Sequence, residues 1–146
     1  MSDKPTQPII PYLYYEDVAA ALQWLAKAFG FREYGAKMSR PGGGIYHAAM
    51  DLDDGIVMMG CPGPGYKSPK RLRQATQSLL VRVHDIDIDR HFERARQAGA
   101  TILQAPETMF RRERRYGAAD PEGHEWYFAQ PIPGGKPKPR RKPARS

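Results

Sequence analysis

Two stretches of the chain repeat apolar residues at the three-and-four spacing of a helix with one apolar side. The first contains Val18, Ala21, Leu22, Leu25 and Phe29, and the second contains Ile88, Phe92, Ala95 and Ala98. Each stretch is followed by a glycine, Gly30 or Gly99, where a left-handed cap commonly ends a helix. The pattern predicts two amphipathic helices, each of which needs a sheet to cover its apolar side.

Short runs rich in β-branched and aromatic residues, bounded by Gly, Pro and Asp, predict the strands that form this sheet. The predicted strands are 9–15, 33–38, 45–52, 56–60, 78–84, 100–104, 116–119 and 124–130. The segments "LDDG" at 52–55 and "DPEG" at 120–123 have the residues of tight turns between paired strands. We therefore interpret Asp120 and Glu122 as turn residues and not as an acid/base pair.

The two halves of this pattern are copies of one unit. The segments 13–31, "LYYEDVAAALQWLAKAFGF", and 81–100, "VRVHDIDIDRHFERARQAGA", both follow the order strand, acidic turn, helix and glycine. The predicted helix caps Asp17 and Asp85 are 68 positions apart, and so are the turn glycines Gly55 and Gly123. This offset predicts one domain over 9–130, with module one at 9–60, a linker at 61–77 and module two at 78–130.

The net charge of +7 comes mainly from one end of the chain. Residues 131–146, "PIPGGKPKPRRKPARS", contain six Lys or Arg and no acid, whereas residues 1–130 carry 17 basic and 16 acidic side chains. Alternating prolines and a GG pair cannot complete a backbone ladder, so we expect 131–146 to be a disordered basic tail, and 1–8 to be an N-terminal extension. A weak nucleic-acid contact through the tail is one expectation.

The composition restricts the location and the redox chemistry of the protein. A single cysteine, Cys61, excludes an internal disulfide and cannot form a cysteine-rich zinc site. The chain has no apolar run of the length that a membrane helix needs, and its first residues, "MSDKPTQPII", lack the pattern of a secretion signal. We therefore expect a cytoplasmic protein that does not enter a membrane.

The segments "PYLYYEDVAAALQWLAKAFGF", "DIDRHFERARQAGATI" and "RRYGAADPEGHEWYFA" resemble the vicinal oxygen chelate superfamily. This group includes glyoxalase I, extradiol dioxygenases and the fosfomycin and bleomycin resistance proteins. The resemblance implies an α+β fold in which duplicated βαβββ modules form a curled mixed sheet around a cavity, with the helices outside. It also implies a homodimer, because such modules often pair across chains.

Metal-using members of this group place their ligands on the first and last strands of each module. The matching positions here are Ile10, Met59, Ser78 and Tyr127. None of these side chains is a good ligand for zinc, nickel, manganese or iron, which need imidazole, carboxylate or thiolate donors. Shifting the strands by one residue would expose Ile9 or Pro11, Met58, Gln77 or Leu79, and Trp126 or Phe128, which contain no ligand set either. We expect no metal and no cofactor.

The resemblance implies that Ile10, Met59, Ser78 and Tyr127 face the predicted cavity, and strand alternation from these positions assigns their neighbours. The predicted ligand-binding residues are Tyr12, Tyr14, His47, Met59, Ser78, Arg82, Glu125 and Tyr127. Such a surface suits an aromatic or amphipathic organic molecule. Two alternatives stay open: the tyrosines fill a closed core, or Arg82 and Glu125 form a cross-strand ion pair. Alternation does not settle the side of the sheet on which His47 lies. We expect His91 to be solvated, and we identify no catalytic residue.

The leading hypothesis is a binding protein of the antibiotic-resistance type, which holds a small organic molecule without a metal. The alternative is a metal-dependent glyoxalase-like lyase or isomerase, or a dioxygenase, with displaced ligands. The candidates for such ligands are His47, Glu125, Glu33 and Asp51. At least three of them must converge on one point, because catalytic metal sites commonly take three ligands from the protein.

Overall fold

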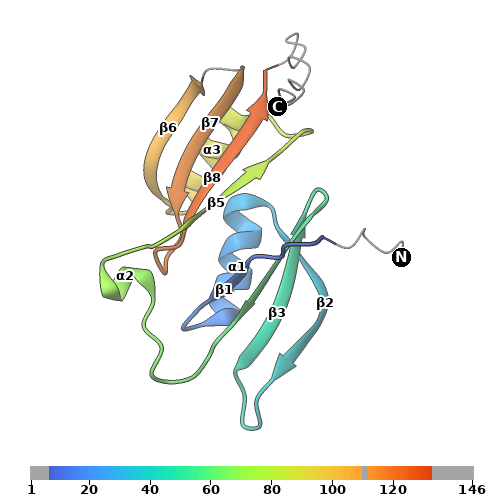
Figure 1. The fold of residues 1–146 in the computed structure, drawn as a ribbon, viewed down its shortest axis with the longest axis vertical. Helices are drawn as coiled ribbons and strands as arrows, with labels where there is room; N and C mark the ends of the chain where they lie inside the picture. The colour runs from blue at the N-terminus through green and yellow to red at the C-terminus, as the bar shows by residue number, and fades with distance from the viewer. Residues whose placement is uncertain (1–6, 110–111, 133–146) are drawn as a thin grey trace, which may run out of the picture.

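The computed structural model describes residues 7–109 and 112–132, and it contains two modules of the same topology (Figure 1). Module one has the strand order β1-β4-β3-β2 and module two has the order β5-β8-β7-β6. The strands of module one are β1 (Tyr12–Tyr14), β2 (Arg32–Ser39), β3 (Ile45–Leu52) and β4 (Gly55–Gly60). Those of module two are β5 (Ser78–Arg82), β6 (Thr101–Met109), β7 (Glu113–Ala119) and β8 (Glu125–Pro131). In each sheet the first strand pairs in parallel with the last, and the other pairs are antiparallel.

The two long helices begin at aspartate caps. Helix α1 (Val18–Phe29) begins after Asp17, whose side chain accepts a hydrogen bond from the backbone N–H of Ala20, and it ends at Gly30 with φ of 81°. Helix α3 (Ile88–Gln97) begins after Asp87, so the prediction of Asp85 as its cap is wrong. The segment between strand and helix is longer in module two, which moves the cap to the later aspartate. A short helix, α2 (Pro69–Leu72), lies in the predicted linker and was not predicted.

The hydrophobic core extends across both modules. The ring of Phe29, at the end of α1, lies 4.6 Å from the ring of Phe128 and 5.7 Å from that of Trp126, measured between ring centroids. All three side chains are buried. Trp24 also donates a 2.8 Å hydrogen bond from Nε1 to the carbonyl of Ala98. The helix of module one therefore packs against module two, and the two modules share one core.

The DPEG turn of module two joins the modules at a second place. Asp120 is buried, and its carboxylate accepts hydrogen bonds from the Tyr15 hydroxyl at 2.6 Å and the Trp126 indole at 3.1 Å. It also accepts from two backbone N–H groups of its own turn. Glu122 accepts hydrogen bonds from the backbone N–H groups of Glu16 and Asp17, just before α1. The structure agrees with a structural role for both carboxylates.

The α+β fold class is confirmed: each sheet has its helix on one side, and burial alternates along the edge strands β1 and β5. The sheets are not closed into a barrel within one chain (Figure 1). We call the side of each sheet that no helix covers its open face. Residues 1–6 and 133–146, which include most of the predicted extension and tail, lie outside the described residues.

Candidate functional site

The open face of module one is aromatic. Tyr12 and Tyr14 alternate with the buried Leu13 and Tyr15, and their side chains are 44% and 49% exposed. The structure therefore places both tyrosines on the open face and not in a closed core. Their rings lie 5.9 Å apart in an edge-to-face arrangement. Tyr66, from the linker, packs edge-on against Tyr14 and donates a 2.9 Å hydrogen bond to its carbonyl.

His47 lies on the same open face. It pairs with Gly60 of β4, which in turn pairs with Tyr14 of β1, and this register puts all three on one side of the sheet. The Tyr12 hydroxyl and His47 Nδ1 are 2.8 Å apart and form a hydrogen bond. Burial, with a smaller contribution from Tyr14, raises the pKa of Tyr12. Tyr12 is therefore a neutral hydroxyl group beside the imidazole at ordinary pH.

The prediction that Met59 lines the open face is wrong. Met59 is fully buried on the helix side with Leu13, and Met58 takes the place beside Tyr12. The cause is the length of the second hairpin. Asp51 pairs with Ile56, whereas Ala119, 68 positions after Asp51, pairs with Glu125, 69 positions after Ile56. The one-residue difference changes the side of the sheet on which each β4 residue lies.

The open face of module two is organised in rows by strand pairing. The first row holds Ser78, Glu125 and Ala119; the second holds Leu80, Tyr127 and Gly117; and the third holds Arg82, Ala129 and Arg115. The structure thus places Ser78, Arg82, Glu125 and Tyr127 on the predicted side. The Tyr127 ring lies over Gly117, where an added Cβ would be 2.4 Å from Tyr127 Cε1. Only glycine leaves room for the ring at this position.

Arg82 pairs with Glu113 and not with Glu125. Arg82 Nε donates to a Glu113 carboxylate oxygen at 2.9 Å, and Arg115 Nη2 approaches the other oxygen at 3.4 Å. Burial acts to raise the pKa of Glu113, but the hydrogen bonds and charges of the two arginines outweigh it and lower that pKa. Glu113 and Arg115 lie outside the predicted strand 116–119, whereas β7 begins at Glu113. Their alternation with Gly117 could have indicated the longer strand.

His91 is buried, so the expectation that it is solvated is wrong. Its Nε2 is 2.8 Å from the Phe29 carbonyl, and its Nδ1 is 2.5 Å from the Tyr116 hydroxyl. Burial lowers the pKa of His91. Helix α3 has two neighbours, its own sheet and α1, so its buried side is wider than its apolar residues indicate. His91 holds the two modules together and is remote from the open faces.

The residues at the family's metal positions do not form a ligand set. Ile10 and Met59 offer no suitable donor, and within 7–109 and 112–132 no group of three His, Cys, Asp or Glu side chains is placed to hold a metal ion. Of the displaced candidates, His47 and Asp51 lie on β3 and Glu125 lies on β8 of the other sheet. Glu33 pairs with Lys37 at 3.0 Å. A single chain does not bring these donors together.

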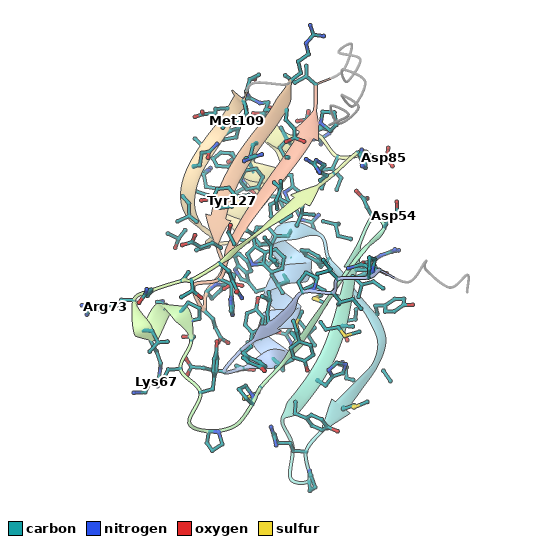
Figure 2. All side chains as sticks on the ribbon, in the orientation of Figure 1. Asp54, Lys67, Arg73, Asp85, Met109 and Tyr127 are labelled. Atoms are coloured by element: carbon teal, nitrogen blue, oxygen red, sulfur yellow. The ribbon has the colours of Figure 1, made fainter. Side chains whose placement is uncertain are left out.

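A cleft of about 260 Å³ lies between the modules, and two residues of the open face of module two, Leu80 and Arg82, line it. Its walls include Phe31, Trp126, Leu79 and Val81, and Arg82 lies among its polar residues. Figure 2 shows Asp54, at the β3–β4 turn, and Asp85, after β5, near the same side of the molecule. Residues of the β3–β4 hairpin, 52–57, form one wall of this cleft, and residues 79–82 of β5 form another.

The sequence pattern of the Glyoxalase/Bleomycin resistance protein/Dioxygenase superfamily matches residues 8–128. The chain belongs to this family, as the sequence resemblance predicted. No helix of the described residues has the length and apolar character needed to cross a membrane.

Relatives of known sequence or structure agree with this assignment. The uncharacterized protein Rv0887c of Mycobacterium tuberculosis is 33% identical over 125 residues, which are 84% of this chain and 73% of that protein. TioX from Micromonospora sp. ML1 is 32% identical, with a TM-score of 0.64 over 89% of this chain and 100% of that chain. The fosfomycin resistance protein FosX from Mesorhizobium loti shares the fold, with 16% identity and a TM-score of 0.59 over 87% of this chain and 93% of that chain.

Proposed function

We propose that the protein binds a small aromatic or amphipathic organic molecule on its open faces without a metal ion. The observation that carries this proposal is the set of large apolar side chains that the sheets leave uncovered. Tyr12, Tyr14 and Leu80 are each between 44% and 49% exposed. Tyr12 and Tyr14 lie on β1 and are in contact, and Leu80 lies on the open face of the other sheet. Large apolar side chains that are exposed together commonly mark a binding site.

The chemistry of these side chains indicates the class of ligand. Tyrosine rings offer flat apolar surfaces with a polar edge, and the thioether of Met58 adapts to irregular shapes. The hydrogen-bonded pair of Tyr12 and His47 adds a polar group that can orient the ligand. Few, well-placed polar groups on an apolar surface are typical of small-molecule sites.

We further propose that a homodimer completes the site. Each open face is a shallow surface in one chain, and small-molecule sites bury most of their ligand. If module one of one chain faces module two of the other, Tyr12, Tyr14 and His47 lie opposite Arg82, Glu125 and Tyr127. Two equivalent cavities then form, and the uncovered apolar side chains are buried. Analytical ultracentrifugation tests the assembly directly: a monomer at micromolar concentration contradicts it.

Resistance by sequestration is the role that fits such a site. A protein that holds a toxic molecule in a cavity lowers its free concentration without a chemical step, so it needs no catalytic group. The family name includes bleomycin resistance proteins, which supports this class of role. Expression in a sensitive bacterial host, with aromatic antibiotics offered one at a time, tests it through the shift in inhibitory concentration.

The first experiment is native mass spectrometry of the protein purified without chelator and then offered Zn²⁺, Ni²⁺, Mn²⁺ and Fe²⁺. We expect metal-free subunits that retain organic adducts. One tightly bound metal per cavity would instead support a lyase, isomerase or dioxygenase that gathers His47 and Glu125 from different chains.

A variant pair then locates the site. Tyr12→Ala removes a ring from the open face of module one, and we expect adduct binding to weaken about fivefold, because stacked aromatic contacts contribute on the order of 1 kcal/mol. Tyr46→Ala is the matched control, because Tyr46 is 38% exposed but alternates with His47 on β3. Equal losses in both variants would contradict a site on the open face.

A further inference from the structure

Two guanidinium groups on the open face of module two share a single carboxylate. Arg82 and Arg115 lie in the same row, on either side of Ala129, and each contacts Glu113 through one nitrogen. A guanidinium carries five N–H donors, so most donors of this pair are not used by Glu113. The Nε of Arg115 is covered from solvent and has no hydrogen-bond partner in the described part of the chain.

The charges around this row leave an excess of positive charge. Arg82 and Arg115 carry two positive charges against the one negative charge of Glu113. Glu107 pairs in register with Arg115 and is exposed, while Arg112 is exposed at the adjoining turn. Glu125 lies two rows away, beside Ser78. With Arg112 and Glu107 included, three positive charges stand against two negative ones. This end of the sheet therefore keeps one positive charge for an anion, and the Glu113 carboxylate orients both guanidinium groups.

We propose that the ligand carries a carboxylate or a comparable oxyanion that binds Arg82 and Arg115. The planar fork of a guanidinium matches a carboxylate, and such charge-assisted bonds are among the strongest that side chains form. Tyr127 occupies the next row, with its ring held over Gly117, and supplies an apolar contact for a ring attached to the anion. This inference rests on the proposed binding function and names the group that orients the ligand.

Three naphthalene probes of similar shape test the charge preference. They are 2-naphthoate, 2-naphthamide and 2-naphthylmethylammonium, titrated by fluorescence at pH 7 and low salt. We expect 2-naphthoate to bind about tenfold more tightly than 2-naphthamide, the change that one good charge-assisted hydrogen bond gives. We expect the ammonium probe to bind most weakly. The preference should shrink as salt screens the partly exposed arginines.

Substitutions in the row of Arg82 and Arg115 test whether these arginines cause the preference for 2-naphthoate over 2-naphthamide. Arg82→Gln and Arg115→Gln should each reduce the preference for 2-naphthoate, and the double variant should abolish it while 2-naphthamide still binds. Glu113→Gln removes the negative charge that repels 2-naphthoate but keeps an acceptor oxygen that can orient the guanidinium groups, so it should strengthen 2-naphthoate binding about threefold. Arg90→Gln is the matched control, because Arg90 is exposed on α3, which packs on the other side of this sheet. Arg115→Lys, which keeps the charge and loses the fork, serves if Arg115→Gln does not fold.

The outcomes separate this inference from the proposed function. Equal binding of 2-naphthoate and 2-naphthamide by the wild type, with Tyr12→Ala weakening both, overturns the anion site and leaves the binding function standing. Equal loss from Arg90→Gln and Arg115→Gln also overturns it, because the effect would then be one of net charge. If none of the probes binds, or if Tyr12→Ala has no effect on any of them, both proposals fail.

Discussion

The open faces of the two modules have the same strand order but carry different chemistry. Module one presents tyrosines, a methionine and a histidine, whereas module two presents two arginines, three glutamates and a tyrosine. The helix-covered sides, in contrast, are apolar in both modules. The duplication has preserved the side of each sheet that builds the core, and the two open faces have diverged.

This contrast indicates that the two modules contribute different interactions to ligand binding. An aromatic face provides contact area with little geometric selectivity, while a charged face selects a functional group and fixes its orientation. A ligand held between the two faces would be recognised by its ring on one side and by its charge on the other.

The largest effect should come from Asp120, which has no counterpart in module one, where the same position is Leu52. Asp120→Ala leaves the Tyr15 hydroxyl, the Trp126 indole and two backbone N–H groups buried without their acceptor. We expect the free energy of unfolding to fall by about 3–5 kcal/mol, measured by urea denaturation.

Asp54→Ala is the control for this loss, because Asp54 is exposed at the turn of module one. We expect its stability to stay within about 0.5 kcal/mol of the wild type. A loss in Asp54→Ala as large as that in Asp120→Ala would contradict the role given to the DPEG carboxylate.

A smaller loss of stability should follow from Gly117→Ala, which changes the open face of module two. The new Cβ would meet the Tyr127 ring at 2.4 Å, so the ring must move away from the centre of the open face. We expect a loss of about 1–3 kcal/mol in stability and weaker binding of naphthalene probes. Gly65→Ala, where an added Cβ meets nothing within 4 Å, should change neither.

His91 is buried where the two modules meet, and for this reason we expect the stability of the protein to depend on pH. Burial lowers its folded-state pKa, so the unfolded chain binds a proton more readily than the folded protein does. Its contribution is therefore fully present above the unfolded-state pKa of about 6.5 and is lost as the pH falls below that value. The groups nearest to it are Tyr116, Asp53 and Arg94.

Urea denaturation between pH 8 and pH 5 measures this dependence. We expect His91→Gln to be less stable than the wild type at pH 8 and to lose less of its stability on acidification. His84→Gln, which changes an exposed histidine, should keep the wild-type slope. An unchanged slope in His91→Gln would show that other groups dominate the acid response.

The smallest effect should come from the exposed ion pair of Glu93 and Arg96 on α3. Solvent screens both charges, and ordering two long side chains opposes the attraction between them. We expect Glu93→Gln to have a Tm equal to that of the wild type within experimental error. A clear decrease would mean that this helix depends on surface charge more than on its buried side.

Several local features of the fold were open to prediction, because their causes lie within a few residues. The three-and-four spacing of apolar residues gave both long helices, and turn residues such as those of DPEG separated the strands correctly. Tyr12, Tyr14, Arg82 and Glu125 lie on the side of their strands that alternation gave, once the resemblance had implied that Ile10, Ser78 and Tyr127 face the cavity. His47 could not be assigned until its pairing with Gly60 was known.

The sequence by itself determined the duplicated modules, the two long helices, the strands and the family. The spacing of apolar residues and the repeated turn residues are local features that do not depend on tertiary contacts. Only the tertiary structure decided that Met58 and not Met59 lies on the open face, because the β3–β4 turn is one residue shorter than the β7–β8 turn and the 68-residue offset does not extend to β4. It alone decided that His91 is buried and that Arg82 pairs with Glu113. These outcomes depend on contacts between residues far apart in the chain, and no local pattern specifies which neighbour a side chain meets.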